Sequence, residues 1–327
     1  MNKKIWAVGG GKGGIGKSVF TLGLAISLAR LGRKLILVDA DLGGANLHTL
    51  MGVRYPPYTL EDFLLKRVGR LEDIIIDTQV EGIGLICGAD DILGAANPTH
   101  AQKMRLLHQM ADLPADLVLV DLGAGTSFNV LDFFNYSPGK ICLLTNQATS
   151  LQNVYGFIKS SLYRHLSREF ARNYQVLDWL MQSDLKKGDE AESLNEFLLQ
   201  LNETEPESCQ RLVHLLREFQ VFLVVNMVKS DRDFQAALII EKVCNSFLSL
   251  KPRVLGQLSY DPAVEGAVNQ LIPFPLRHEK SQAARDLERI AFTFLESPHP
   301  SPGQAANHKL PGKETGFWSR FWHRAEA

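Results

Sequence analysis

Residues 9–18 read Gly-Gly-Gly-Lys-Gly-Gly-Ile-Gly-Lys-Ser and directly follow the apolar run 5–8. The phosphate-binding motif G-x-x-x-x-G-K-[ST] is met by four of these residues, Gly11, Gly16, Lys17 and Ser18. Glycine allows the tight bends that aim successive backbone N–H groups at phosphate oxygens. In such a loop Lys17 reaches the β- and γ-phosphates, and the Ser18 hydroxyl ligates Mg²⁺. The stretch therefore predicts a nucleotide-binding loop between a buried strand and a helix over 18–31, whose N-terminal dipole also attracts anions.

Lys12 is the distinctive residue of this loop, because the general motif does not require a lysine at that position. A glycine-rich stretch with two lysines could also be a surface linker, but a linker would not lie between an apolar strand and an apolar helix. We therefore expect nucleotide contacts along the whole loop, from Gly11, Lys12, Gly13, Gly14, Ile15, Gly16, Lys17 and Ser18.

The composition is that of a globular protein. The chain has 327 residues, enough for one large domain or for two smaller ones. Its net charge is −1, so the overall balance does not indicate bulk binding to nucleic acid. The four cysteines form no C-x-x-C pair, and Cys87 and Cys142 lie in apolar runs that predict buried free thiols. We expect neither a signal peptide nor a membrane-spanning segment, and hence a cytosolic, reduced protein.

Short apolar runs alternate with helical patterns along the chain. The predicted strands are 4–9, 34–39, 83–87, 116–121, 139–145, 220–226 and 253–258. The predicted helices include 17–31, 98–112, 149–170, 230–249 and 280–295. Several of the strands are apolar without alternation, as in a parallel sheet that is covered on both faces. The pattern predicts a doubly wound, mostly parallel α/β sheet of the P-loop NTPase type, in which ligands bind beyond the carboxyl ends of the strands.

Two regions depart from this alternation. Residues 171–216 form a polar insertion with an acidic centre, which predicts a helical hairpin or an extended helix, either a solvated decoration or a partner-binding surface. Residues 297–315 are rich in proline, glycine and small polar residues and predict a flexible tether. The expected organisation is a single P-loop domain over 1–296 that carries the insertion, followed by the linker and an amphipathic helix over 316–327.

The C-terminal segment 316–324 reads Gly-Phe-Trp-Ser-Arg-Phe-Trp-His-Arg. At helical spacing its four large aromatic side chains fall on one arc of about 140°, namely Phe317, Trp318, Phe321 and Trp322. Aromatic rings beside arginines suit the headgroup region of an anionic membrane. Docking on this protein or on a partner, or no role at all, are the alternatives. Because so short a helix is not stable alone in water, we expect it to fold on binding.

Two predicted strands end in carboxylates at the edge of the sheet where phosphates would lie. The strand 34–38 runs into Asp39-Ala-Asp41, where a carboxylate can orient the attacking water or hold the water shell of a metal ion. The strand 117–120 ends in Asp121, and four apolar residues followed by aspartate are typical of an Mg²⁺-linked carboxylate. Aspartate at a strand end is also a common cap or turn residue, so this prediction depends on the preceding phosphate-binding loop.

These motifs resemble those of the MinD/ParA group of ATPases with a deviant Walker A motif. Within that group they are most similar to the MinD-like regulators of flagellar number and placement, the FlhG family. The resemblance rests on Lys12 in the loop and on four further stretches, 39–47, 121–132, 225–228 and 260–264. It covers residues 3–296 apart from the insertion.

The resemblance implies an ATPase that binds ATP and Mg²⁺ and encloses the nucleotide between two copies of the chain. Lys12 would reach across this homodimer to the partner's nucleotide and would belong, with Lys17 and Asp41, to the catalytic set. Asp41 would position the hydrolytic water. The residues expected to hold or orient Mg²⁺ are Ser18, Asp41 and Asp121.

The resemblance also implies contacts to the base and to a switch segment. Asn226 would recognise adenine, beside a turn that carries Asp261, although Asn226 could instead be a strand-end turn residue. Asn46 would lie near the phosphates.

Together, the resemblance and the tail predict a switch between a soluble monomer and an ATP dimer bound to an anionic membrane through 316–324. Such a protein is cytoplasmic, associates peripherally with the inner face of the cell membrane, and positions or counts a flagellum or a division site. Its hydrolysis would be slow and stimulated by an unidentified protein activator.

Two other classes of function share the predicted fold. A ParA-like ATPase that partitions DNA or cargo needs a basic surface for nonspecific DNA, and the last predicted helices show no such cluster, so we expect no specific nucleic acid. An amide-forming ligase predicts a Cys-His arrangement, and an iron–sulfur scaffold needs closely paired cysteines, neither of which is evident.

Overall fold

The computed structural model describes residues 4–88, 98–185 and 193–297. The predicted C-terminal helix and all but the first residue of the predicted linker lie outside this range. Within it, none of the helices combines the length and the apolar character needed to cross a bilayer.

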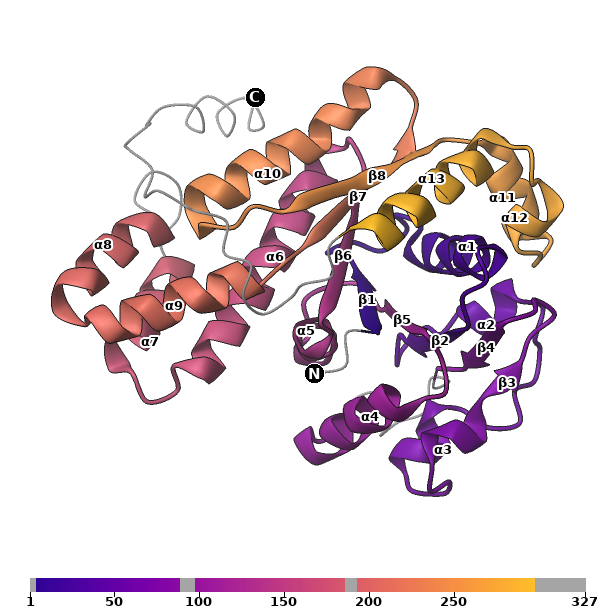
Figure 1. Ribbon diagram of the computed structural model, residues 1–327, viewed down its shortest axis with the longest axis horizontal. Helices are drawn as coiled ribbons and strands as arrows, with labels where there is room; N and C mark the ends of the chain where they lie inside the picture. The colour runs from indigo at the N-terminus through magenta and orange to yellow at the C-terminus, as the bar shows by residue number, and fades with distance from the viewer. Residues whose placement is uncertain (1–3, 89–97, 186–192, 298–327) are drawn as a thin grey trace.

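A twisted sheet forms the centre of the fold (Figure 1), with strands in the order β3-β4-β2-β5-β1-β6-β7-β8. The strands are β1 (Ile5–Gly9), β2 (Leu35–Ala40), β3 (Ile76–Asp77), β4 (Ile83–Ile86), β5 (Leu117–Leu122), β6 (Gly139–Leu144), β7 (Phe222–Val228) and β8 (Arg253–Ser259). All neighbouring pairs are parallel except β3 with β4. The doubly wound, mostly parallel sheet predicted from the sequence is confirmed, and the two-residue strand β3 is the addition to it.

The helices fill the connections between the strands. They are α1 (Lys17–Arg30), α2 (Leu47–Leu50), α3 (Leu60–Leu64), α4 (His100–Asp112), α5 (Phe128–Tyr136), α6 (Ala148–Glu169), α7 (Tyr174–Leu185), α8 (Leu194–Thr204), α9 (Pro206–Glu218), α10 (Gln235–Leu248), α11 (Pro262–Asn269), α12 (Phe274–Arg277) and α13 (Gln282–Glu296). Two short 3₁₀ helices cover Leu71–Ile74 and Asp231–Phe234.

Side chains alternate between the two faces of the sheet, and each face has its own core. On β1, Trp6 and Val8 join the core formed with α1 and α13, whereas Ile5 and Ala7 join the core formed with α4, α5, α6 and α10. The Trp6 ring lies 4.4 Å from that of Phe294 on α13. This two-sided burial is the physical reason for the uninterrupted apolar runs in the strands.

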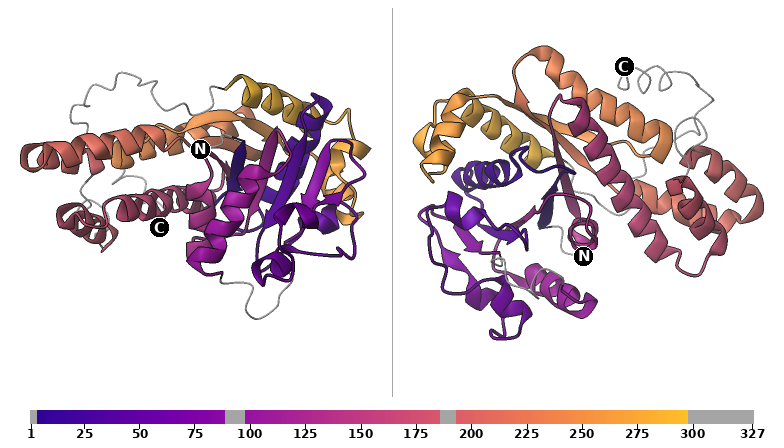
Figure 2. Two further views of the ribbon diagram at one scale, coloured as in Figure 1. Left: turned by 60° about the horizontal axis from the view of Figure 1, so that its bottom comes forward. Right: turned by 180° about the vertical axis from the view of Figure 1, so that it is seen from behind.

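The described residues of the insertion, which exclude 186–192, form three helices, α7, α8 and α9, rather than the predicted hairpin or single helix. These helices lie at the end of the molecule opposite α11 and α12 (Figures 1 and 2). Trp179 of α7 stacks on Phe197 of α8 at 4.6 Å and lies 5.8 Å from Tyr163 of α6. The insertion therefore extends the core beneath α6 and α10, and its description as a solvated decoration is wrong. The acidic residues between its apolar positions obscured the buried face of these helices, although the helical character itself was predicted.

The four cysteines confirm the prediction of buried thiols. Cys87, Cys142, Cys209 and Cys244 are all free and buried.

Candidate functional site

The phosphate-binding loop connects β1 to α1 at the carboxyl end of the sheet. Gly14 and Gly16 have φ angles of 77° and 85°, in the region that favours glycine, so the backbone path of the loop favours glycine at these two positions. At Gly11 a Cβ atom would lie 2.2 Å from the Asn153 carbonyl oxygen, which shows how closely the loop approaches α6. The Lys17 Nζ donates to the Lys12 carbonyl at 3.3 Å, and the Lys17 side chain folds back over the loop.

The two lysines of the loop differ in exposure. Lys17 is only 8% exposed, and burial lowers its pKa, while the charges of Asp121 and Asp41 act in the opposite direction. Lys12 is exposed, and its Nζ lies 3.4 Å from the Thr149 hydroxyl on the first turn of α6. Lys17 thus lies near Asp121 and Asp41, whereas Lys12 lies at the surface.

Asp39 and Asp121 lie side by side, because the register of β2 with β5 pairs them directly. Both are buried. Burial and the neighbouring charge of Asp39 raise the pKa of Asp121 to about 7, although hydrogen bonds from Ser18 and Thr21 oppose the change. The Thr21 hydroxyl donates to Asp121 Oδ1 at 3.1 Å. This pair of strand-end carboxylates therefore forms a buried acidic edge beside Lys17 and Ser18.

Asp39 was not singled out as a site residue by the sequence, yet it organises the loop that follows. Its Oδ2 accepts backbone N–H groups of Asn46 at 2.9 Å and Leu47 at 3.0 Å, at the start of α2. Burial raises the pKa of Asp39 to about 6, and these hydrogen bonds work against that rise. One feature of the sequence could have identified Asp39. It is a carboxylate that directly follows the apolar residues of β2, just before the chain enters the next loop.

Asp41, predicted to position the water, lies partly buried where two loops meet. A Cβ atom on Gly123, in the loop after β5, would lie 2.7 Å from Asp41 Oδ1. The structure thus brings Asp41 against the loop that follows Asp121. Asn46 is exposed, and its side-chain amide donates to the Gly44 carbonyl at 2.5 Å.

The residues of this edge suit a magnesium–nucleotide complex. Two adjacent buried carboxylates with raised pKa values favour a cation nearby. Mg²⁺ in such sites is held by one or two protein groups and by phosphate oxygens, so a full protein cage is not needed. Accordingly, the described part of the chain contains no group of three His, Cys, Asp or Glu side chains that could hold a metal ion. Mg²⁺ binding by the predicted residues Ser18, Asp41 and Asp121 stays a prediction.

The predicted base-binding residues lie at the carboxyl ends of β7 and β8. Asn226 is buried; its Nδ2 donates to the Ile15 carbonyl at 2.8 Å, and its Oδ1 accepts the Met227 N–H. Asn226 therefore supports the phosphate-binding loop in this structure. Asp261 caps α11 through the Ala263 N–H at 3.0 Å. Adenine contacts by these two residues stay predictions.

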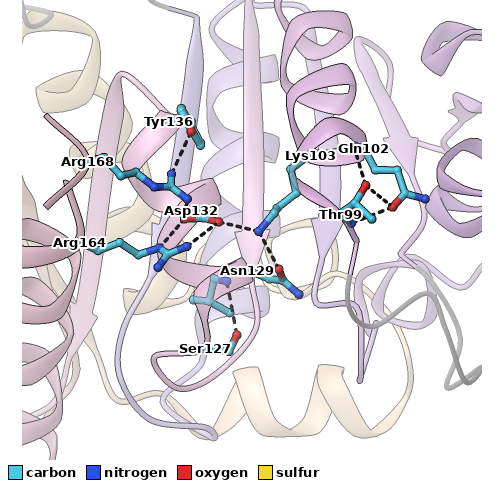
Figure 3. A network of polar contacts seen from close by, with 10 residues as sticks. Thr99, Gln102, Lys103, Ser127, Asn129, Asp132, Tyr136, Arg164 and Arg168 are labelled. Carbon is cyan, nitrogen blue, oxygen red and sulfur yellow. Dashed lines mark hydrogen bonds and ion pairs between the residues drawn. The ribbon is translucent and has the colours of Figure 1, made fainter. Parts of the chain in front are cut away.

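A buried ionic cluster anchors α5, the helix that begins directly after the loop from Asp121 (Figure 3). Asp132 is fully buried and binds Lys103 of α4 at 2.6 Å, Arg164 of α6 at 2.5 Å and Arg168 of α6 at 2.8 Å. Burial acts to raise the pKa of Asp132, but the hydrogen bonds from Arg164 and Lys103 keep it below its ordinary value. This cluster, which the sequence did not reveal, joins α4, α5 and α6 beside the site.

The chain belongs to the CobQ/CobB/MinD/ParA nucleotide binding domain family, whose model matches residues 6–274. This confirms the predicted family, which is a family of nucleotide-binding domains.

Two curated relatives each match about half of the chain. The antiactivator FleN of Pseudomonas aeruginosa is 32% identical over 158 residues, which are 48% of this chain and 55% of FleN. The flagellum site-determining protein YlxH of Helicobacter pylori is 32% identical over 160 residues, 48% of this chain and 53% of YlxH. The chain thus spans about half the length of the curated relatives it matches.

Solved structures confirm the fold. The cell division ATPase MinD of Pyrococcus furiosus aligns with a TM-score of 0.61 and 21% identity over 90% of this chain and 99% of that one. The septum site-determining protein MinD of Pyrococcus horikoshii, solved with Mg-ADP, aligns with a TM-score of 0.59 and 19% identity over 88% of this chain and 94% of that one. At these identities the likeness shows the architecture alone.

Proposed function

We propose that the protein is a Mg²⁺-dependent ATPase that dimerises on binding ATP and, as a membrane-associated dimer, positions or counts a cellular structure. The observation that carries this proposal is the arrangement of Lys17, Ser18 and Asp121 at one sheet edge, with Lys12 exposed beside them. The family match and the similarity to a flagellum site-determining protein support it.

Each residue of the edge has a distinct task in this proposal. The loop N–H groups and Lys17 bind the phosphates, and Ser18 and Asp121 hold Mg²⁺, which neutralises charge on the phosphate oxygens. Asp41, between the two loops, orients the attacking water. Asn226 keeps the loop in shape from behind and contacts the base with its remaining amide hydrogen.

Lys12 provides the proposed link between subunits. Its Nζ approaches the Thr149 hydroxyl at 3.4 Å at the surface, a contact that costs little to exchange. When two copies meet, Lys12 leaves Thr149 and contacts the nucleotide of the partner subunit. ATP bound by both copies then holds the dimer together, and hydrolysis releases it.

The tail supplies the proposed membrane contact. We assign residues 1–296 to the ATPase domain with its insertion, 297–315 to a linker and 316–327 to a membrane-binding helix. One such helix binds weakly, whereas a dimer presents two on linkers that allow both to engage, so affinity rises steeply on dimerisation. The protein then cycles between the cytoplasm and the inner face of the cell membrane, under the control of a protein activator.

Two loop variants and one truncation test this proposal. Lys17→Ala should lose ATP binding, while Lys12→Ala should bind ATP but remain monomeric in sedimentation velocity with Mg²⁺ and ATP. Full-length protein should co-sediment with phosphatidylglycerol vesicles more with ATP than with ADP, and a chain that ends at Lys313 should not. Persistent ATP dimers of Lys12→Ala, or equal vesicle binding by all samples, would contradict the proposal. ATP-dependent, salt-sensitive retention on DNA would instead favour the partitioning alternative.

A further inference from the structure

The segment that follows β2 carries Asp41 and two adjacent glycines. Residues 41–47 read Asp-Leu-Gly-Gly-Ala-Asn-Leu and run from the end of β2 to the first residue of α2. A Cβ atom on Gly43 would meet no other atom within 4 Å, so this position lies in open space. Because glycine leaves the backbone the greatest conformational freedom, contacts outside the glycines must fix the position of Asp41.

Asp39 holds both ends of this segment. Its Oδ1 accepts the N–H of Asp41 at 3.2 Å, at the start of the segment. Its Oδ2 accepts the N–H groups of Asn46 at 2.9 Å and of Leu47 at 3.0 Å, at the end of the segment. The two oxygens of one carboxylate therefore hold the two ends, and this carboxylate is fully buried in β2.

The loop after β4 presses on Asp39 and on the segment from the side. A Cβ atom on Gly88 would lie 2.7 Å from Ala45 Cβ, 2.9 Å from the Asp39 carbonyl oxygen and 3.2 Å from Asp39 Cγ. No side chain fits at position 88 unless these groups move apart. This packing leaves the Asp39 carboxylate little freedom to turn away from the N–H groups that it accepts.

The side chain of Asp41 is held less firmly than its backbone. Its Oδ1 accepts the N–H of Gly43 at 3.4 Å, which is long for a hydrogen bond. Its carboxylate also lies against Gly123, where a Cβ atom would come within 2.7 Å of Oδ1. The place of the Asp41 carboxylate beside the loop from Asp121 is therefore set mainly by its backbone, and so by Asp39.

From these contacts we infer that Asp39 is a positioning residue for hydrolysis, which holds Asp41 in place through the two ends of residues 41–47. The inference rests on the proposed function, in which Asp41 orients the attacking water. A misplacement of about 1 Å at a group that orients a reactant can lower the rate about 100-fold. Asp39 thus acts on the chemical step through Asp41 and has little effect on the affinity for nucleotide.

Asparagine at position 39 releases one end of the segment with little change in shape. Its amide has one acceptor oxygen, which stays with the two N–H groups of Asn46 and Leu47, while its NH₂ group faces the N–H of Asp41. The substitution also removes a negative charge beside Asp121, the partner of Asp39 in the register of β2 with β5. The lost hydrogen bond and the lost repulsion act in opposite directions, so we expect the melting temperature to stay within about 4 °C of the native value.

Single-turnover hydrolysis of Mg²⁺–ATP by the full-length protein, together with the Kd for Mg²⁺–ADP from calorimetry, tests the inference. Asp39→Asn should lower the rate constant at least about tenfold and keep the Kd within about threefold. Gly88→Ala, which displaces Ala45 without changing a charge, should also lower the rate. Asp116→Asn is the matched control and should change neither quantity. Asp116 also accepts a backbone N–H, that of Lys34 at 2.9 Å, but at the opposite edge of the same two strands.

A double-mutant cycle with Asp41→Asn separates positioning from a direct role of Asp39. If Asp39 acts through Asp41, Asp39→Asn should cause no further loss of rate once Asp41 is replaced. A native rate in the single variant Asp39→Asn, or a full second loss in the double variant, would overturn the inference.

A native rate in Asp41→Asn would instead refute the role that the proposed function gives to Asp41. Amide hydrogen exchange then tests the hold of Asp39 on the segment alone. Exchange of the Asp41 N–H should be at least about tenfold faster in Asp39→Asn than in the native protein. Unchanged exchange at Asp41, Asn46 and Leu47 would overturn the inference whatever the rate of hydrolysis.

Discussion

Replacing Asp132 by asparagine should destabilise the protein far more than a surface substitution. Asp132 is fully buried and neutralises part of the charge of Lys103, Arg164 and Arg168, whose side chains are 8%, 21% and 34% exposed. Asparagine keeps the shape and one acceptor but leaves three cations without a counter-charge. Removing one partner of a buried ion pair costs about 3–5 kcal/mol, and we expect a loss of unfolding free energy in that range.

The pH dependence of this loss identifies its cause. The pKa of Asp132 is held below its ordinary value, so the carboxylate stabilises the folded state above that ordinary value and loses the effect as the pH falls through its folded pKa. Urea unfolding of native protein and Asp132→Asn should therefore differ most at pH 7, and the difference should shrink below about pH 4. Asp73→Asn, which changes a half-exposed carboxylate on the surface, should cost less than about 0.5 kcal/mol.

The same variant should separate hydrolysis from binding. Helix α5 begins directly after the loop that joins Asp121 to Ser127, so a loosened α5 misplaces that loop while the phosphate-binding loop is unchanged. We expect the Kd for ATP to stay within about threefold and kcat to fall about tenfold. An unfolding free energy within 1 kcal/mol of the native value at pH 7, or a loss that does not depend on pH, would refute this account of the cluster.

Two further substitutions test single contacts. Lys140 is 5% exposed, and burial lowers its pKa to about 8. Below pH 8 its charge therefore lowers the free energy of unfolding by about 3 kcal/mol, and this cost disappears as the pH rises toward 10.5. Lys140→Met removes the 2.6 Å hydrogen bond to the Ser137 carbonyl. The variant should still have an unfolding free energy about 2 kcal/mol higher than the native protein at pH 7, and a smaller gain at pH 10. A variant less stable than the native protein at pH 7 would contradict this. Asn226→Ala removes the amide that binds the Ile15 carbonyl and should weaken ATP binding about tenfold in calorimetry, whereas unchanged affinity would show that the loop needs no support from β7.

The nucleotide loop and the strands were predictable because each depends on local sequence. Gly16 adopts a positive φ angle at a position where the motif requires glycine, and the buried strands are apolar runs in the sequence. Asp121 was predictable from its position at the end of such a run. In each of these cases the structural feature is formed by residues that are close together in the sequence.

The remaining features depend on residues that are distant in the sequence. Asp132 looks like an ordinary helical aspartate until Lys103 and Arg164 are brought to it from two other helices. The pairing of Asp39 with Asp121 depends on sheet register across 82 residues. The insertion was misjudged because its buried leucines and aromatic residues alternate with carboxylates, and only tertiary packing shows which side of each helix faces inward.

Helix α6 gives the site and the insertion a common support. Its first turn contacts the phosphate-binding loop through Thr149, its middle binds Asp132 through Arg164, and Tyr163 packs on Trp179 of the insertion. At 22 residues it is about 33 Å long and has no proline within it, so it can carry a displacement from one end to the other as a rigid element. Coupling between the phosphate-binding loop and the insertion through α6 requires that the helix has two distinct positions. The proposed exchange of Lys12 from Thr149 to a partner's nucleotide acts on the first turn of α6 and is the step that would shift this helix. Dimerisation would then be transmitted to the insertion through the contact of Tyr163 with Trp179.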